Sequence, residues 1–198
     1  MLTKAEKTKQ YILETVGPYF NKHGYTGTSL SDITKATGLS KGAIYGNFEN
    51  KEELALEAFN YNIRQAMGTL RAHMDMEAPG ISKLFAITNF YRSYYLDNKL
   101  SGGCPMLNMG IDSMNHNSIL YNRVVDVMNK LVKGLSDLIE QAKSEGAIKD
   151  EIDSDYYANQ MYAQIQGSIF MSYMRNNNRQ MVDMMNSIDQ VIRKELMT

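Results

Sequence analysis

The spacing of apolar residues, together with the scarcity of proline, constrains the fold most strongly. Only three prolines interrupt the 198 residues, and alternation of apolar and polar residues never persists beyond a few positions. Apolar residues instead recur three and four positions apart, which places them on one face of a helix. The sequence therefore predicts an all-α protein.

Helix boundaries can be predicted from capping patterns. Thr3 with Glu6, and Ser29 with Asp32, form pairs typical of a helix start, and glycine is typical just beyond a helix end. We expect helices at about 3–24, 29–38, 40–47, 50 to the low 70s, 81–97, from 105 onward, 120–142, 153–175 and 181–196.

Composition excludes several classes of protein. The net charge of −1 excludes a uniformly basic nucleic-acid coat and a highly charged disordered tail. Apolar runs stay far below the ~20 residues of a membrane span, and the first residues lack the apolar stretch of a secretory signal. The single cysteine cannot form an internal disulfide. We therefore expect a cytoplasmic protein without membrane contact.

Charge and methionine are unevenly distributed along the chain. Residues 1–51 carry seven lysines and four acidic residues, a net charge of +3, which leaves −4 for the remainder. Apart from Met1, all the methionines lie at Met67 or later. This asymmetry suggests two modules with different partners.

Residues 29–48 carry the functional signal, because two short predicted helices meet there at Gly38. Five apolar residues fall inside the corner: Leu30, Ile33, Leu39, Ile44 and Phe48. Five residues are left facing outward: Ser40, Lys41, Gly42, Tyr45 and Asn47. This pattern is typical of a helix-turn-helix, whose second helix enters the DNA major groove. A plain helical corner with a solvated face is the alternative.

The outward residues have the chemistry of DNA contact. Lys41 can reach phosphate or guanine, Asn47 can bind an adenine edge, and Gly42 permits close approach of the backbone. Tyr45 and Ser40 suit phosphate oxygens.

The same region resembles the DNA-binding domain of the tetracycline-repressor (TetR) family of transcriptional regulators. The resemblance covers about residues 5–60 and rests on Phe20, Gly24-Tyr25, Thr28-Ser29, Asp32-Ile33, Gly38-Leu39-Ser40-Lys41-Gly42, Ile44-Tyr45, Phe48 and Asn50-Lys51-Glu52-Glu53-Leu54. It implies DNA contacts by Thr28, Ser40, Lys41, Gly42, Tyr45, Asn47 and Lys51. The expected organisation is a DNA-binding domain over 1–50, a connecting helix over 51–75, and a ligand-binding and dimerisation domain over 76–198.

A competing motif favours an enzyme. Residues 38–42 match the Gly-x-Ser-x-Gly elbow of hydrolases, but that elbow follows a strand and its serine needs a positioned histidine and acid. A helix is predicted before Ser40, and the three histidines show no metal-ligand spacing. We expect no catalytic residues, metal or cofactor, although a helical enzyme remains the outside alternative.

The second half offers apolar, polarisable side chains with polar handles that suit a small, partly hydrophobic effector. The candidate ligand-binding residues are Phe90, Tyr91, Tyr94, Met106, Asn108, Met109, Asp112, Met128 and Tyr162. Ordinary core packing is the alternative for each of them.

The leading hypothesis is a homodimeric repressor that binds double-stranded DNA at a palindromic operator and is released by a small molecule. We expect dimerisation through the last two helices, because a methionine- and isoleucine-rich stripe runs along residues 181–192. An activator is an alternative. Another is a redox- or electrophile-sensing regulator, because Cys104 precedes a predicted helix start that can lower a thiol pKa.

Overall fold

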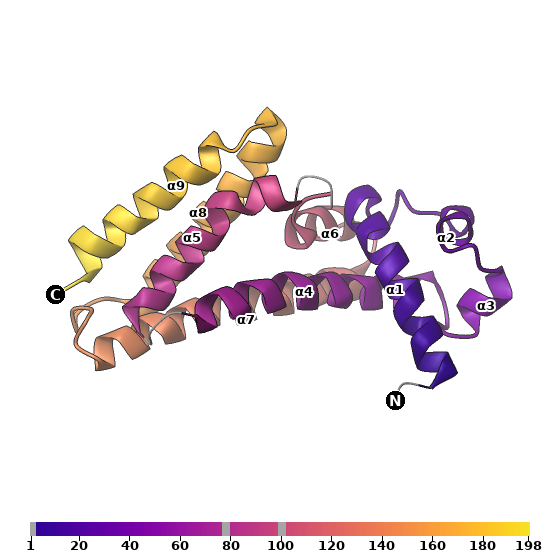
Figure 1. The fold of residues 1–198 in the computed structure, drawn as a ribbon, viewed down its shortest axis with the longest axis horizontal. Coiled ribbons are helices and arrows are strands. Elements are labelled where there is room, and N and C mark those ends of the chain that lie inside the picture. Colours follow the sequence, from indigo (N-terminus) through magenta and orange to yellow (C-terminus); the bar gives the residue numbers. More distant parts are fainter. Residues whose placement is uncertain (1–2, 77–79, 99–101) are drawn as a thin grey trace. The chain divides into compact units, whose positions relative to one another are not determined.

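The computed structural model describes residues 3–76, 80–98 and 102–198, and the regular structure in these ranges is helical (Figure 1). The elements are α1 (Lys4–His23), α2 (Leu30–Thr37), α3 (Lys41–Tyr45), α4 (Lys51–Asp75), α5 (Ile81–Asn98), α6 (Pro105–Ser113), α7 (Ser118–Ser144), α8 (Ser154–Arg175), α9 (Arg179–Val191) and the π-helical segment η2 (Ile192–Leu196). One isolated antiparallel bridge joins Ile148 to Met197. The all-α prediction is confirmed.

Helix ends follow the capping patterns of the sequence. Thr3 caps α1 in a box with Glu6, and Ser29 caps α2 in a box with Asp32. The third helix is shorter than predicted and ends at Tyr45, because the Asn47 side chain donates to the Ala43 carbonyl at 2.8 Å. The predicted last helix is divided into α9 and η2.

The chain forms two compact units, and each is discontinuous in sequence. Unit 1 comprises Met1–Ala66 and Ser101–Val125, and unit 2 comprises Met67–Leu100 and Asp126–Thr198. These ranges do not follow the expected boundaries near residues 50 and 75, because α6 and the start of α7 pack with the first helices. The remainder of α4 and of α7 belongs to unit 2.

In unit 1, α4 approaches α1 closely at Gly17. The Asn62 side chain donates to the Gly17 carbonyl at 2.8 Å, and a Cβ on Gly17 would lie 2.7 Å from the Asn62 Oδ1. Helix α1 continues through the adjoining Pro18. Apolar residues of four helices and of the α3–α4 connection are buried in the core here: Ile12, Val16, Phe20, Ile33, Ile44, Phe48, Leu54, Ala55, Ala58 and Phe59.

In unit 2, α5, α8 and α9 lie side by side (Figure 1). An ion pair between Arg92 and Asp189 joins α5 to α9, and Thr88 donates to the same carboxylate at 2.6 Å. Four residues of the stripe expected at a dimer interface are instead buried within the protomer, Met181, Met185, Ile188 and Ile192, whereas Met184 is half-buried. That interpretation of the stripe is wrong, because α5 and α8 already cover it.

None of the helices in the described ranges has the length and hydropathy needed to cross a membrane.

The burial of Ile188 generates a stability prediction. Ile188→Glu places an unpaired carboxylate in the core of unit 2, and we expect it to lower the free energy of unfolding by about 4 kcal/mol or more. Urea denaturation followed by circular dichroism measures this loss. The adjacent exposed variant Ser187→Glu is the control and should unfold like the wild type. If Ile188→Glu is instead a stable, folded monomer, Ile188 belongs to a dimer interface and not to the core.

Candidate functional site

The corner between α2 and α3 is fixed by its backbone. Gly38 adopts the left-handed conformation with φ +69° and donates its N–H to the Thr34 carbonyl at 2.9 Å. Ser40 then caps α3 by accepting the Ala43 N–H at 3.2 Å. On the inner side, Ile33, Ile44 and Phe48 are buried, as the sequence predicted. Leu30 and Leu39 are only half-buried.

The outer side of the corner carries most of the predicted DNA contacts. Ser40, Lys41 and Gly42 are exposed, and Tyr45, Asn47 and Lys51 are half-buried. The Asn47 Nδ2 donates a hydrogen bond to the Ala43 carbonyl, and its Oδ1 can still accept one from a DNA base. The structure therefore brings these six residues onto α3, its N-cap and the chain that runs from α3 to the first residue of α4.

Thr28 lies apart from this group. Its side chain is 0% exposed, and its hydroxyl donates to the Gly24 carbonyl at 2.7 Å. The Thr28 hydroxyl therefore closes the turn that precedes α2.

Three lysines of unit 1 lie over aromatic rings. The Lys41 Nζ is 5.9 Å from the centre of the Tyr45 ring, and the Lys9 Nζ is 5.0 Å from that of Phe48. The Lys51 Nζ is 4.3 Å from that of Tyr25. Such contacts attract the ammonium group to the ring face and restrict its position.

Lys51 has the most distinctive electrostatic environment of the three. Burial lowers its pKa, and the negative charge of Asp112 on α6 partly opposes that effect. Its ammonium group thus contacts the Tyr25 ring and is also within the electric field of the Asp112 carboxylate. Sequence reasoning missed the role of Tyr25, although the residue belongs to the motif at the end of α1.

The geometry at Ser40 is that of a helix cap. Its Oγ accepts a backbone N–H, and the preceding element is α2 rather than a strand. The hydrolase-like motif therefore lacks the strand-to-helix elbow that exposes a nucleophile. Among the described residues, no cluster of three histidine, cysteine or acidic side chains could hold a metal.

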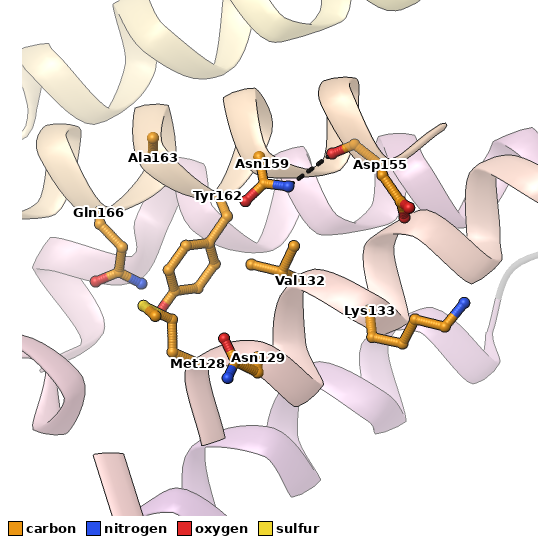
Figure 2. A pocket seen from close by; sticks show the side chains of 9 residues that line it. All are labelled: Met128, Asn129, Val132, Lys133, Asp155, Asn159, Tyr162, Ala163 and Gln166. Carbon is orange, nitrogen blue, oxygen red and sulfur yellow. Dashed lines mark hydrogen bonds between the residues drawn. The ribbon is translucent and has the colours of Figure 1, made fainter. Parts of the chain in front are cut away.

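Unit 2 contains a groove of about 530 Å³ between α7 and α8 (Figure 2). Two predicted ligand residues line it, and the Tyr162 ring extends from α8 towards Met128 on α7 (Figure 2). The other lining residues are Asn129, Val132, Lys133, Asp155, Asn159, Ala163 and Gln166. This mixture of apolar walls and amide groups suits a small amphipathic molecule.

The other candidate ligand residues lie elsewhere. Phe90, Tyr91 and Tyr94 form an aromatic cluster on α5, with ring centres 5.2 to 6.0 Å apart. Met106 and Met109 are buried on α6 in unit 1.

The remaining two candidates are engaged with the DNA-binding half of unit 1. Asn108 donates to the Asn21 carbonyl at 2.8 Å, and Asp112 accepts the Thr26 backbone N–H at 3.0 Å. Sequence spacing gives no signal for these contacts, because the partners lie 86 or more positions apart.

Comparison with known proteins agrees with this geometry. Residues 19–58 match the family model described as bacterial regulatory proteins, tetR family, and residues 80–188 match the model described as tetracyclin repressor-like, C-terminal domain. A transcriptional repressor named DhaR from Mycobacterium sp. (strain GP1) is 25% identical over 174 residues, covering 85% of this chain and 84% of that protein.

Two solved structures resemble the whole chain. The TetR-family regulator from Cytophaga hutchinsonii is 31% identical with a TM-score of 0.89, and the alignment covers 98% of this chain and 96% of that one. A TetR regulator from Chloroflexus aurantiacus is 29% identical with a TM-score of 0.93, covering 99% of each chain. The chain therefore belongs to the TetR family of DNA-binding transcriptional regulators.

Proposed function

We propose that the protein is a homodimeric repressor that binds a palindromic operator and leaves it when a small, partly hydrophobic molecule binds. The exposed side of α3 carries this proposal, because it presents Lys41 and Tyr45 from a short helix held against a rigid corner. The naming of the Mycobacterium relative as a repressor supports the choice of repressor over activator.

The dimer interface in this proposal lies along α8. Tyr156, Ala163 and Phe170 are exposed at intervals of seven residues, as are Gly167 and Met174. Seven residues are about two helical turns, so these side chains share one face, and its small residues allow close approach of a partner helix. Phe170 is 53% exposed and Met174 68% exposed, which is unusual for apolar side chains of this size.

Two-fold symmetry connects the dimer to its DNA. A C2 dimer presents its two α3 helices in related orientations, which fits half-sites about 34–36 Å apart on one face of the duplex. An effector that binds the DNA-incompetent arrangement better shifts the population towards it. A coupling free energy of about 1–3 kcal/mol changes operator affinity about 5- to 150-fold.

The effector site in this proposal includes the groove between α7 and α8. Met128 and Val132 supply apolar contact there, and Tyr162 adds a ring with a hydroxyl group (Figure 2). The aromatic cluster of Phe90, Tyr91 and Tyr94 provides a second set of candidate contacts in unit 2.

The first of three predictions from this proposal concerns DNA contact. Rounds of selection from random double-stranded DNA should enrich a palindromic site. On that site Lys41→Ala should bind more weakly, and the slope of log K against log salt should flatten by about 0.9 because one phosphate contact is lost. Tyr45→Phe should also weaken binding, since it removes a hydroxyl donor but keeps the ring.

The matched control is Lys130→Ala, which removes an exposed lysine from the part of α7 that lies in unit 2. Its affinity and salt slope should equal those of the wild type. Wild-type affinity in both Lys41→Ala and Tyr45→Phe would mean that α3 is not the DNA-contacting face.

The second prediction concerns assembly. Phe170→Glu and Met174→Glu place charges on the exposed face of α8, and each should convert a wild-type dimer into monomers in sedimentation velocity. Leu96→Glu is the control, because Leu96 is a 61% exposed apolar residue of α5. If the α8 variants remain dimeric while retaining the wild-type fold, the interface lies elsewhere.

The third prediction separates a reversible effector from chemistry at Cys104. Cys104 is buried at the start of α6, and Cys104→Ser should leave both operator affinity and effector release unchanged. Operator binding is measured for both proteins with peroxide, quinone or aldehyde, in parallel with a screen of aromatic compounds. Release of the wild type but not of the variant by an electrophile would establish the sensing alternative instead.

A further inference from the structure

The turn that follows α1 is held by a side chain from α6. The Thr26 backbone N–H donates to Asp112 Oδ2 at 3.0 Å, and the Thr26 hydroxyl donates to Asp112 Oδ1. Both carboxylate oxygens are therefore used by one residue of the turn. Hydrogen bonds to an ionised acceptor are stronger than those between neutral groups.

The backbone of the turn is built around this carboxylate. Gly24 has φ +74°, and a Cβ at this position would lie 2.9 Å from Asp112 Oδ2. A larger residue would therefore be strained and would also displace the carboxylate.

The turn positions two elements of the DNA-binding surface. It leads directly into Ser29, the cap of α2, and so fixes where the helix-turn-helix begins. It also carries Tyr25, whose ring lies 4.3 Å from the Lys51 ammonium group. The Asp112 carboxylate is thus linked to Lys51 in two ways, since it holds the turn that carries Tyr25 and its negative charge acts directly on the ammonium group.

Helix α6 is a fixed support for this carboxylate. Asn108 donates to the carbonyls of Asn21 and Gly102, at 2.8 and 2.6 Å, and Asn21 donates to the Gly103 carbonyl at 2.9 Å. These bonds join the start of α6 to the end of α1, one to two helical turns from Asp112.

We propose that Asp112 is a positioning residue for operator binding, which holds the Gly24–Thr28 turn so that Tyr25 keeps Lys51 at the DNA surface. This inference rests on the proposed function, and in it Asp112 touches no DNA. Its negative charge also repels phosphate, so two effects oppose each other. Hydrogen bonds at contact distance outweigh repulsion screened by salt, so the net effect of the carboxylate is to strengthen binding.

The central variant is Asp112→Ala, compared with Asp112→Asn and with Ile111→Ala, a change at a 71% exposed neighbour on the same helix. We expect Asp112→Ala to weaken operator binding about tenfold, the usual effect of losing a charge-assisted hydrogen bond. Asp112→Asn keeps an oxygen for the Thr26 N–H and should lose less. Ile111→Ala should bind like the wild type.

Salt dependence distinguishes positioning from a general loss of stability. If Lys51 leaves its place, the slope of log K against log salt flattens by about 0.9, whereas partial unfolding lowers the active fraction without changing the slope. The double variant Thr26→Val with Asp112→Ala should bind no worse than Asp112→Ala alone, because both act through the same contact.

Hydrogen exchange of the free protein tests the turn without DNA. In Asp112→Ala, the backbone amide of Thr26 should exchange about tenfold faster than in the wild type or in Ile111→Ala. A wild type that selects no DNA would overturn the proposed function. A wild type that binds, together with an Asp112→Ala variant whose affinity, salt slope or Thr26 exchange is unchanged, would overturn this inference alone.

Discussion

The left-handed backbone at Gly38 determines what the DNA-binding surface can present. A Cβ at this position would meet no atom within 4 Å, so glycine is required for its φ of +69° rather than for space. The chain reverses there within a few residues, and the two serine caps fix where α2 begins and α3 follows. Because Ile33 and Ile44 are buried on the inner side of the corner, the Lys41 side chain lies on its outer side. The placement of α3 on the outer side of the corner depends on this turn.

The DNA-binding unit is completed by a segment from much later in the sequence. Asn117 donates to Glu52 at 2.6 Å, Arg123 donates to Asn60 at 2.7 Å, and Leu120 is fully buried. These contacts support the first half of α4, which begins at the candidate phosphate contact Lys51. A fragment of the first 50 residues would lack this support. Unit 1 therefore includes more of the chain than the helix-turn-helix motif. Residues outside the motif, on α7, help to hold the DNA-binding surface in place.

Features that depend on neighbouring residues could be predicted from the sequence, whereas contacts between residues far apart in the sequence could not. Capping pairs, the glycine turn and the exposure of Lys41 follow from residues within four positions of one another. The roles of Asp112 and of the 181–192 stripe depend on which helix, distant in sequence, packs against them. The sequence alone shows only that these positions are polar or apolar. The sequence suggests Asp112 as a ligand contact, but its carboxylate accepts the Thr26 backbone N–H. The sequence likewise suggests Ile188 as an interface residue, but its side chain lies in the core of unit 2. Thr28 was expected on the DNA face by resemblance, and its hydroxyl is turned inward.

Communication between effector and operator in the proposed mechanism depends on the two helices that both units share. Residues of α4 and of α7 divide between unit 1 and unit 2, so each is a continuous helix with one end in the DNA-binding unit. Lys51 is the first residue of α4, and Met128 of the groove lies three residues, less than one helical turn, beyond Val125, where unit 1 ends on α7. In that mechanism, a shift in the unit 2 portion of either helix is carried to its other end, because an α-helix with internal hydrogen bonds resists bending. Only about 1–3 kcal/mol has to be carried in this way to change operator affinity substantially, which is comparable to the loss of one or two charge-assisted hydrogen bonds. In the proposed mechanism, a small number of polar contacts at the base of α4 is thus sufficient to set the response.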